Sequence, residues 1–191
     1  MSKYADLNGI LEAGGVALLP TETVYGLACL ANNSQAVDRI YALKGRTFQK
    51  PLAVCVQDID MARAFGLFSP KAIALAERYW PGSLTLIVEA KPGLHIDAKC
   101  QSMSGGTPTI AFRCPEADWL PALNGPLALT SANRSGEKDC VSYAESMAEF
   151  AEEIDGSLRA NVALSGLPST IVSVLDEEIK ILRQGTLEVT L

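Results

Sequence analysis

The chain has 191 residues, 48% of which are hydrophobic, and its formal net charge is −6. A chain of this length and composition builds a hydrophobic core without staples, so we expect a single domain spanning residues 1–191. The acidic charge argues against tight nucleic-acid binding through phosphate contacts, so we expect weak or no direct RNA binding. No apolar run reaches the length of a membrane span, so no membrane association is expected.

Helices and strands alternate in the first part of the chain. The predicted elements are a helix over 5–13, strands over 16–19 and 24–30, a helix from 34 to 44, and a strand over 52–56. Ser34 is expected to cap the second helix, and Gly45 is the residue just past its end.

The same alternation continues to the end of the chain. The predicted elements are a helix from 70 to 80, strands over 84–88, 109–112 and 127–129, a helix from 142 to about 154, and paired strands over 170–175 and 179–182. Residues 92–108 predict a long loop, which is our candidate cover for a binding site. This pattern indicates the α/β (α+β) class.

Ready-made binding motifs are missing from the sequence. Five cysteines occur without C-x-x-C spacing, and three of them lie in apolar runs. Buried thiols in a reducing compartment explain this better than disulfides or a metal site, so we expect a cytoplasmic protein with no metal site of its own. Neither G-x-x-x-x-G-K-[ST] nor G-x-G-x-x-G after a strand is present, so any nucleotide must bind without them.

A polar break between two apolar strands is the most informative feature. Buried strands do not normally break into residues such as Thr21-Glu22-Thr23 unless the break faces water or a ligand. Lys44 and Arg46 follow, and a fixed cation pair beside hydroxyls suits an anionic ligand such as a nucleotide phosphate. Alone, Lys44-Gly45-Arg46 would indicate ordinary helix termination; the preceding break favours a site.

Several predicted strands end on polar or cationic residues. These are Thr21, Arg113, Ser131 and Arg183. Ligands of open α/β sheets bind at strand ends, so we hypothesise that the four residues meet in one pocket. Strand direction cannot be deduced from the sequence, and each residue by itself is typical of a surface position.

Three motifs together resemble the YrdC-like family, the threonylcarbamoyl-AMP synthases. They are P-T-E-T-V-Y-G-L at 20–27, K-x-R at 44–46 and S-A-N at 131–133, and the resemblance extends from about Gly14 to Gly185. It implies a three-layer α/β fold with a twisted mixed sheet and a large concave face. The chain is similar to the short bacterial form, which has a single catalytic domain.

The resemblance also implies roles for individual residues. Lys44 and Arg46 match the catalytic cations of the family. The implied ATP-binding residues are Lys44, Arg46, Thr109, Ser131, Asn133 and Arg183. The implied threonine-binding residues are Thr21, Arg113 and Ser169, with Arg113 holding the substrate carboxylate.

The implied reaction joins L-threonine, bicarbonate and ATP into threonylcarbamoyl-AMP and pyrophosphate, with Mg²⁺ accompanying the triphosphate. The product would pass to partner proteins that form threonylcarbamoyladenosine in tRNA. Positioning and charge stabilisation carry most of such catalysis, which suits a site of cations and hydroxyls without a nucleophile.

Departures from the family pattern leave alternatives open. Thr47 and Gln184 replace common prolines, and Cys55 replaces a histidine seen in some members. The usual proline and second serine after S-A-N are missing, so no contact is carried over to Asp139 or Cys140. An RNA-binding paralogue without this activity, or a related carbamoyl-transfer enzyme, therefore remains a candidate.

Overall fold

The computed structural model describes residues 3–161, 163–175 and 178–190. Its helices are α1 (Lys3–Glu12), α2 (Ser34–Lys44), α3 (Ile59–Phe65), α4 (Pro70–Tyr79) and α5 (Tyr143–Phe150), with 3-10 turns η1 (Ala98–Cys100) and η2 (Leu120–Ala122). Its strands are β1 (Ala17–Pro20), β2 (Tyr25–Leu30), β3 (Ala53–Cys55), β4 (Gly66–Leu67), β5 (Leu84–Ala90), β6 (Gln101–Ser104), β7 (Thr107–Arg113), β8 (Leu127–Ser131), β9 (Gly156–Ser157), β10 (Thr170–Leu175) and β11 (Glu178–Arg183).

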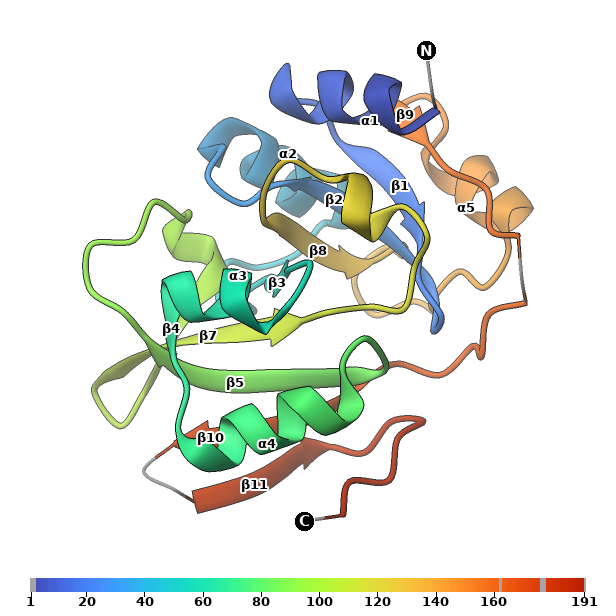
Figure 1. Cartoon of the computed structure of the whole chain (residues 1–191). Coiled ribbons are helices and arrows are strands. Elements are labelled where there is room, and N and C mark those ends of the chain that lie inside the picture. Colours follow the sequence, from blue (N-terminus) through green and yellow to red (C-terminus); the bar gives the residue numbers. More distant parts are fainter. Residues whose placement is uncertain (1–2, 162, 176–177, 191) are drawn as a thin grey trace.

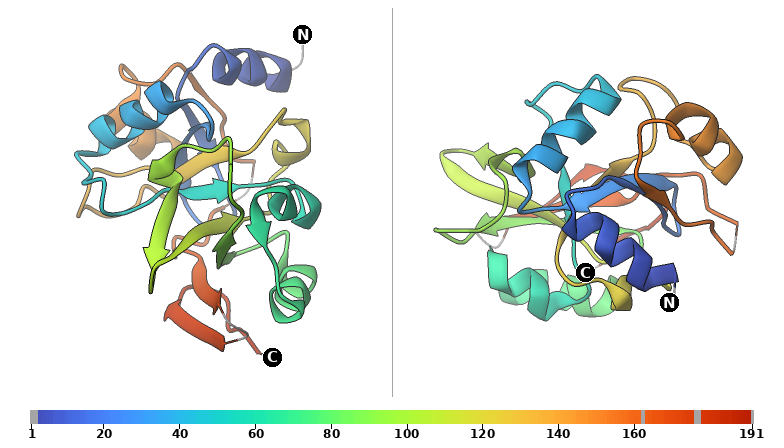
Figure 2. Two further views of the ribbon diagram at one scale, coloured as in Figure 1. Left: turned by 90° about the vertical axis from the view of Figure 1, so that its left-hand side faces the viewer. Right: turned by 90° about the horizontal axis from the view of Figure 1, so that it is seen from above.

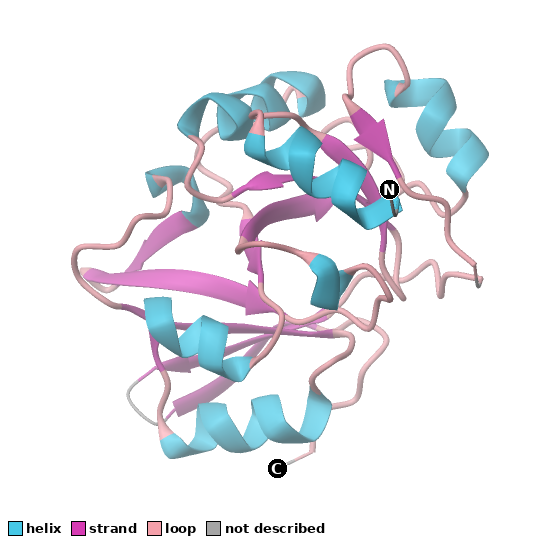
Figure 3. Ribbon diagram, turned by 45° about the horizontal axis from the view of Figure 1, so that its top comes forward, coloured by secondary structure: helices cyan, strands magenta, loops and turns pink. Residues whose placement is uncertain are grey.

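The described strands form one mixed sheet in the order β11-β10-β5-β7-β3-β8-β2-β1-β9, with β4 beside β5 and β6 beside β7. Strands run through the middle of the molecule and helices lie around them (Figure 3). Figure 1 places α1 and α2 beside β1 and β2, and α4 beside β5 and β10 at the opposite end. The predicted α/β class with a twisted mixed sheet is confirmed.

The sheet brings together strands that are distant in sequence. β5 pairs antiparallel with β7 and parallel with β10, although β10 begins about eighty residues after β5 ends. In the left view of Figure 2, β10 and β11 lie at the end of the molecule away from α1. Strand order, and not chain order, therefore decides which side chains become neighbours.

Local sequence signals explain where most helices begin and end. Gly45 ends α2 in the left-handed region at φ 57°, and its N–H bonds the Ala42 and Tyr41 carbonyls. Ser69 caps α4 ahead of Pro70, as predicted. The predicted cap of α2 is wrong by one residue, because Asn33 and not Ser34 accepts the Ala36 N–H.

Helix α5 opens with the predicted capping box between Ser142 and Glu145. It ends at Phe150, four residues before the predicted end. Helix α3 was missed, because only Ala62 of its seven residues is buried and no apolar stripe marks it. None of the described helices has the length and apolar character that crossing a membrane requires.

The predicted loop over 92–108 is correct only as far as residue 97. Residues 101–104 form β6, which pairs with an extended β7 through a turn at Gly105 and Gly106, with φ 56° and 91°. Two consecutive glycines with positive φ are typical of a two-residue β-hairpin, so the signal was present in the sequence. β6 is polar and largely exposed, which hid it from a search for apolar alternation.

Gly26 lies where β2 and β8 approach closely. A Cβ at this position would lie 2.7 Å from Leu129 Cδ1 and 3.0 Å from the Thr130 carbonyl oxygen. We expect Gly26→Ala to lower the free energy of unfolding by about 1–3 kcal/mol through overpacking. Urea unfolding measures the change, and Gly125→Ala is the matched control because its Cβ meets nothing nearer than 3.8 Å. Equal stability of the two variants would contradict this prediction.

Candidate functional site

A cavity of about 420 Å³ lies on one face of the sheet. Six of the residues predicted from the sequence line it. They are Thr21, Arg46, Arg113, Ser131, Ser169 and Arg183. The hypothesis that the four polar strand ends meet in one pocket is therefore correct in geometry, while the role of each residue stays a prediction.

Strand register explains why these side chains meet. Arg113 at the end of β7 lies opposite Thr85 at the start of β5, and Ile171 on β10 lies opposite the same Thr85. On β5, Leu84 and Leu86 are completely buried, whereas Thr85 and Ile87 alternate with them and line the cavity. Because side chains alternate along a strand, one face forms core and the other forms the site.

The cavity is positive although the chain is acidic. Its lining includes the cations Arg46, Lys50, Arg113 and Arg183, and one carboxylate, Asp139, among the described residues. Cations that line a cavity with partly apolar walls focus a positive potential within it. The arrangement therefore favours an anionic ligand.

The Thr21 side chain holds the polar break in shape. Its Oγ1 donates to the Val24 carbonyl at 2.8 Å and accepts from the Thr23 and Val24 N–H groups at 3.3 Å. Trp119 Nε1 also donates to the Pro20 carbonyl at 2.7 Å. The turn between β1 and β2 is therefore a rigid platform at one end of the cavity.

Arg113 is 8% exposed and is bonded to this platform. Its Nη2 donates to Thr23 Oγ1 at 2.6 Å and to Glu22 Oε1 at 2.9 Å. Its Nε is buried and has no hydrogen-bond partner. Buried donors without a partner are uncommon in folded proteins.

Arg183 and Ser169 form a second linked group in the wall. Arg183 Nε and Nη2 donate to the Ser169 carbonyl at 3.0 and 2.9 Å, and Ser169 Oγ lies 2.9 Å from Thr85 Oγ1. Gly185 permits this, since a Cβ there would lie 2.1 Å from the Pro168 carbonyl oxygen. These hydrogen bonds connect Arg183 at the end of β11 through Ser169 to Thr85 on β5.

Arg46 is held by the loop that follows α2. Its Nε donates to the Lys50 carbonyl at 2.9 Å and its Nη2 to the Pro51 carbonyl at 3.1 Å. Burial lowers the pKa of Arg46 below its usual range, but a guanidinium stays charged at neutral pH. The loop thus points a permanent cation at the cavity.

Lys44 lies behind the cavity wall and not among the lining residues. It is 2% exposed, and its Nζ donates to the Ser131 carbonyl, the Asn133 carbonyl and Asn133 Oδ1. Burial, then the charge of Arg46, lowers its pKa from 10.5 to about 8. Three acceptors match the three donors of an ammonium, so Lys44 organises the segment after β8.

Asn133 also turns inward. Its Oδ1 accepts from Lys44 Nζ and from Ser131 Oγ, both at 2.7 Å, and its Nδ2 donates to the Glu137 carbonyl at 2.7 Å. Its side chain is therefore used within the protein, while Ser131 lines the cavity. The predicted contacts of Lys44 and Asn133 with ATP stay predictions.

Thr109 is another predicted site residue that lies outside the cavity lining. It shares a strand face with Ala111 and Arg113 but pairs with Glu89, two steps farther along β5 than Ile87. It is buried and does not line the cavity. Its predicted nucleotide contact is untested.

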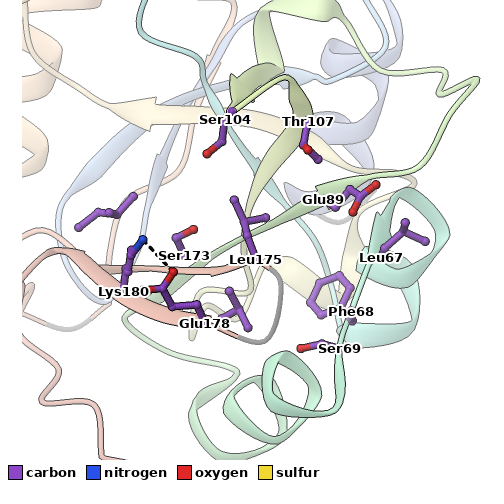
Figure 4. Close-up of a pocket in the computed structure, with 13 residues that line it drawn as sticks. Leu67, Phe68, Ser69, Glu89, Ser104, Thr107, Ser173, Leu175, Glu178 and Lys180 are labelled. Atoms are coloured by element: carbon purple, nitrogen blue, oxygen red, sulfur yellow. Dashed lines mark ion pairs between the residues drawn. The ribbon is translucent and has the colours of Figure 1, made fainter.

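A larger cavity, of about 660 Å³, lies at the far ends of β5, β10 and β11. Figure 4 shows Glu89, Ser173 and Lys180 on its wall, with Lys180 Nζ 2.8 Å from Glu178 Oε2. Among the described lining residues, Lys180 is the one cation and Glu89 and Glu178 are carboxylates, so the cavity does not favour an anion. Ser104 and Thr107 of the β6–β7 hairpin line this cavity, so the expectation that segment 92–108 covers the site is wrong.

Comparison of the chain with known proteins shows its family. The model of the family that includes Sua5, YciO and YrdC, described as "Telomere recombination", matches residues 9–185. The chain belongs to the Sua5/YciO/YrdC family.

Relatives within the Sua5/YciO/YrdC family carry informative names. The chain is 37% identical to the threonylcarbamoyl-AMP synthase of Bacillus subtilis (strain 168), covering 96% of this chain and 53% of that protein. It is 30% identical to the putative threonylcarbamoyl-AMP synthase of Methanocaldococcus jannaschii, covering 92% of this chain and 82% of that one. The chain thus spans about half the length of the Bacillus relative.

A solved structure of Sua5 has the same fold. Sua5 of P. abyssi, in a crystal structure of its complex with L-threonine, superposes with a TM-score of 0.87 at 28% identity. The match covers 98% of this chain and 56% of Sua5.

Several residues in or behind this Sua5/YciO/YrdC site were not assigned from the sequence. Lys50, Thr85 and Asp139 line the cavity, and Glu22 and Thr23 accept hydrogen bonds from Arg113. Glu22 and Thr23 belong to the recognised polar break, and Thr85 is a polar residue in an apolar strand, so both signals were visible. No local pattern marks Asp139, which reaches the cavity through the path of the loop after β8.

Lys44 predicts a dependence of stability on pH. Between pH 8 and 10.5 the folded protein has lost the Lys44 proton while the unfolded chain keeps it, so the free energy of unfolding rises with pH. Relative to Lys44→Met, the wild type should gain stability across this window and run parallel below pH 8. Urea unfolding from pH 7 to 10.5 measures the difference, with Lys50→Met as control. Parallel curves throughout would refute the lowered pKa of Lys44.

Proposed function

We propose that the chain is an L-threonylcarbamoyladenylate synthase, a cytoplasmic enzyme that converts L-threonine, bicarbonate and ATP into threonylcarbamoyl-AMP and pyrophosphate. The observation that carries the proposal is the convergence of Arg46, Arg113 and Arg183 with a set of hydroxyls on one cavity. Family membership and the names of the relatives support it. The product would pass to proteins that modify tRNA.

The cavity suits the chemistry that this reaction requires. The threonine amine adds to the carbon of bicarbonate, water leaves, and a carbamate forms. A carbamate oxygen then attacks the α-phosphorus, and the bond to pyrophosphate breaks. The protein needs to position the reactants and stabilise negative charge, which fixed guanidinium groups do without supplying a nucleophile.

The site divides into two regions in this proposal. Thr21, Arg113 and Ser169 receive the amino acid, and Arg113 offers its guanidinium to the carboxylate. Arg46, Ser131 and Arg183 face the nucleotide, with Lys44 and Asn133 supporting Ser131 from behind. Arg46 is the residue that we assign the catalytic role, because its hydrogen bonds to the Lys50 and Pro51 carbonyls hold its guanidinium at the cavity.

Mg²⁺ would enter with the triphosphate. The described residues contain no group of three or more side chains arranged to hold a metal ion by themselves. A nucleotide-bound Mg²⁺ needs only one or two carboxylates besides phosphates and waters, and Asp139 is placed to supply one. When bound, the ion would neutralise charge on the phosphates.

Pyrophosphate release from ATP tests the proposed function directly. It should require both threonine and bicarbonate, and serine should be compared with threonine. Absence of release, combined with salt-sensitive RNA binding, would instead support a non-catalytic RNA-binding paralogue. Carbamoyl transfer without threonine would support the related carbamoyl-transfer class.

Arg46→Ala should lower kcat by roughly 100-fold or more, because it removes a fixed charge from the transferring phosphate. Steady-state pyrophosphate release measures kcat, and circular dichroism checks that the fold is intact. Arg63→Ala, which removes an exposed cation that does not line the cavity, is the control. Activity of Arg46→Ala near the wild-type level would rule out its catalytic role.

Arg113→Ala should chiefly raise the KM for threonine, by roughly 10–100-fold, since it removes a charge-assisted hydrogen bond to the carboxylate. The KM for ATP should change much less. Varying each substrate at saturation of the other separates the two effects. A change confined to ATP would reassign Arg113 to the nucleotide.

A further inference from the structure

Glu22 is held on a backbone that cannot easily shift. The Ser165 N–H donates to the Glu22 carbonyl at 3.0 Å, and the Gly166 N–H donates to the Thr23 carbonyl at 2.9 Å. The Thr21 side chain closes the same turn from inside. Segments distant in sequence therefore fix the position from which the Glu22 side chain extends.

The carboxylate of Glu22 joins two strands at the cavity wall. Its Oε1 accepts from Arg113 Nη2 at 2.9 Å and from Ser83 Oγ at 3.0 Å. The side chains of Arg113 and Glu22 are 9% and 18% exposed, so water screens their attraction only weakly. Glu22 thereby ties the end of β7 to the start of β5.

This ion pair leaves part of the hydrogen-bonding capacity of both side chains unused. Arg113 Nε and Glu22 Oε2 are both buried, and neither has a hydrogen-bond partner. They are the two such side-chain atoms found in the described part of the chain. A buried ion pair that served stability alone would have hydrogen-bond partners for both of these atoms, because each buried polar atom without a partner lowers the free energy of unfolding.

Glu22 and Arg113 face different spaces. Arg113 lines the 420 Å³ cavity, whereas Glu22 lines a separate cavity of about 350 Å³ with Gly82, Ser83 and Glu116. Glu22 therefore approaches the guanidinium from behind and does not line the candidate site. Any effect of Glu22 on a ligand in that site passes through Arg113.

We propose that Glu22 is a positioning residue that holds the guanidinium of Arg113 in place to receive the carboxylate of an α-amino acid. The inference rests on the proposed function and deepens it. Glu22 and Thr23 occupy Nη2, which restricts rotation of the guanidinium and leaves the part of Arg113 that lines the cavity to the ligand.

The first test is Glu22→Gln, which keeps the shape of the side chain and removes its charge. We expect the KM for threonine to rise roughly 10-fold or more, from loss of the charge-assisted bond, while kcat and the KM for ATP stay within about 3-fold. Glu116→Gln is the matched control, because Glu116 lines the same rear cavity without an ion pair to Arg113. Glu22→Asp should fall between Gln and the wild type.

A double-mutant cycle separates positioning from a merely structural role. If Glu22 acts through Arg113, Glu22→Gln should cost nothing further in threonine affinity when added to Arg113→Met. Calorimetric titration of threonine into each variant with ATP present measures this, and Arg113→Lys replaces Arg113→Met if the latter does not fold. Additive losses in the cycle would overturn the inference.

The outcomes also separate this inference from the proposed function. A wild-type protein that releases no threonine-dependent pyrophosphate contradicts the proposed function. A wild-type protein that does, combined with Glu22→Gln indistinguishable from Glu116→Gln, overturns only the role of Glu22.

Discussion

The pairing of β5 with β7 on one side and β10 on the other is the constraint on which the site depends. Through it, Arg113, Thr85 and Ile171 lie in one row across three strands. Neighbouring strands lie about 5 Å apart, so side chains in such a row must either pack or share a ligand. Strand pairing thus converts residues distant in the chain into one wall.

The mixed direction of the strands changes how that wall is built. In a parallel sheet, ligands gather at the carboxyl ends of strands. Here Arg113 and Arg183 stand at the ends of β7 and β11, whereas Thr85 stands at the start of β5. Antiparallel neighbours bring a strand end beside a strand start, so cations and hydroxyls from both kinds of position meet in one cavity.

Two layers of polar contacts surround the cavity. Arg46, Arg113 and Arg183 line it, and each is oriented by protein acceptors. Behind them, Lys44 and Asn133 hold the segment after β8, and Glu22 holds Arg113. Long cationic side chains lose much conformational entropy when they are ordered. Because the protein already orients these side chains, less conformational entropy is lost when a ligand binds.

The sequence by itself determined the class of fold, most strand positions, the polar break at Thr21-Glu22-Thr23 and the set of cations, because apolar periodicity, capping and turn chemistry are local. It failed for α3 and β6. Both elements are short and largely exposed, so neither carries a periodic apolar signal. Only the tertiary structure decided that Ser131 and Asn133 accept all three bonds of the Lys44 ammonium, that Thr109 does not line the cavity and that Glu22 supports Arg113. Those outcomes depend on which strands pair and in what register, and long-range pairing leaves no mark in the local pattern.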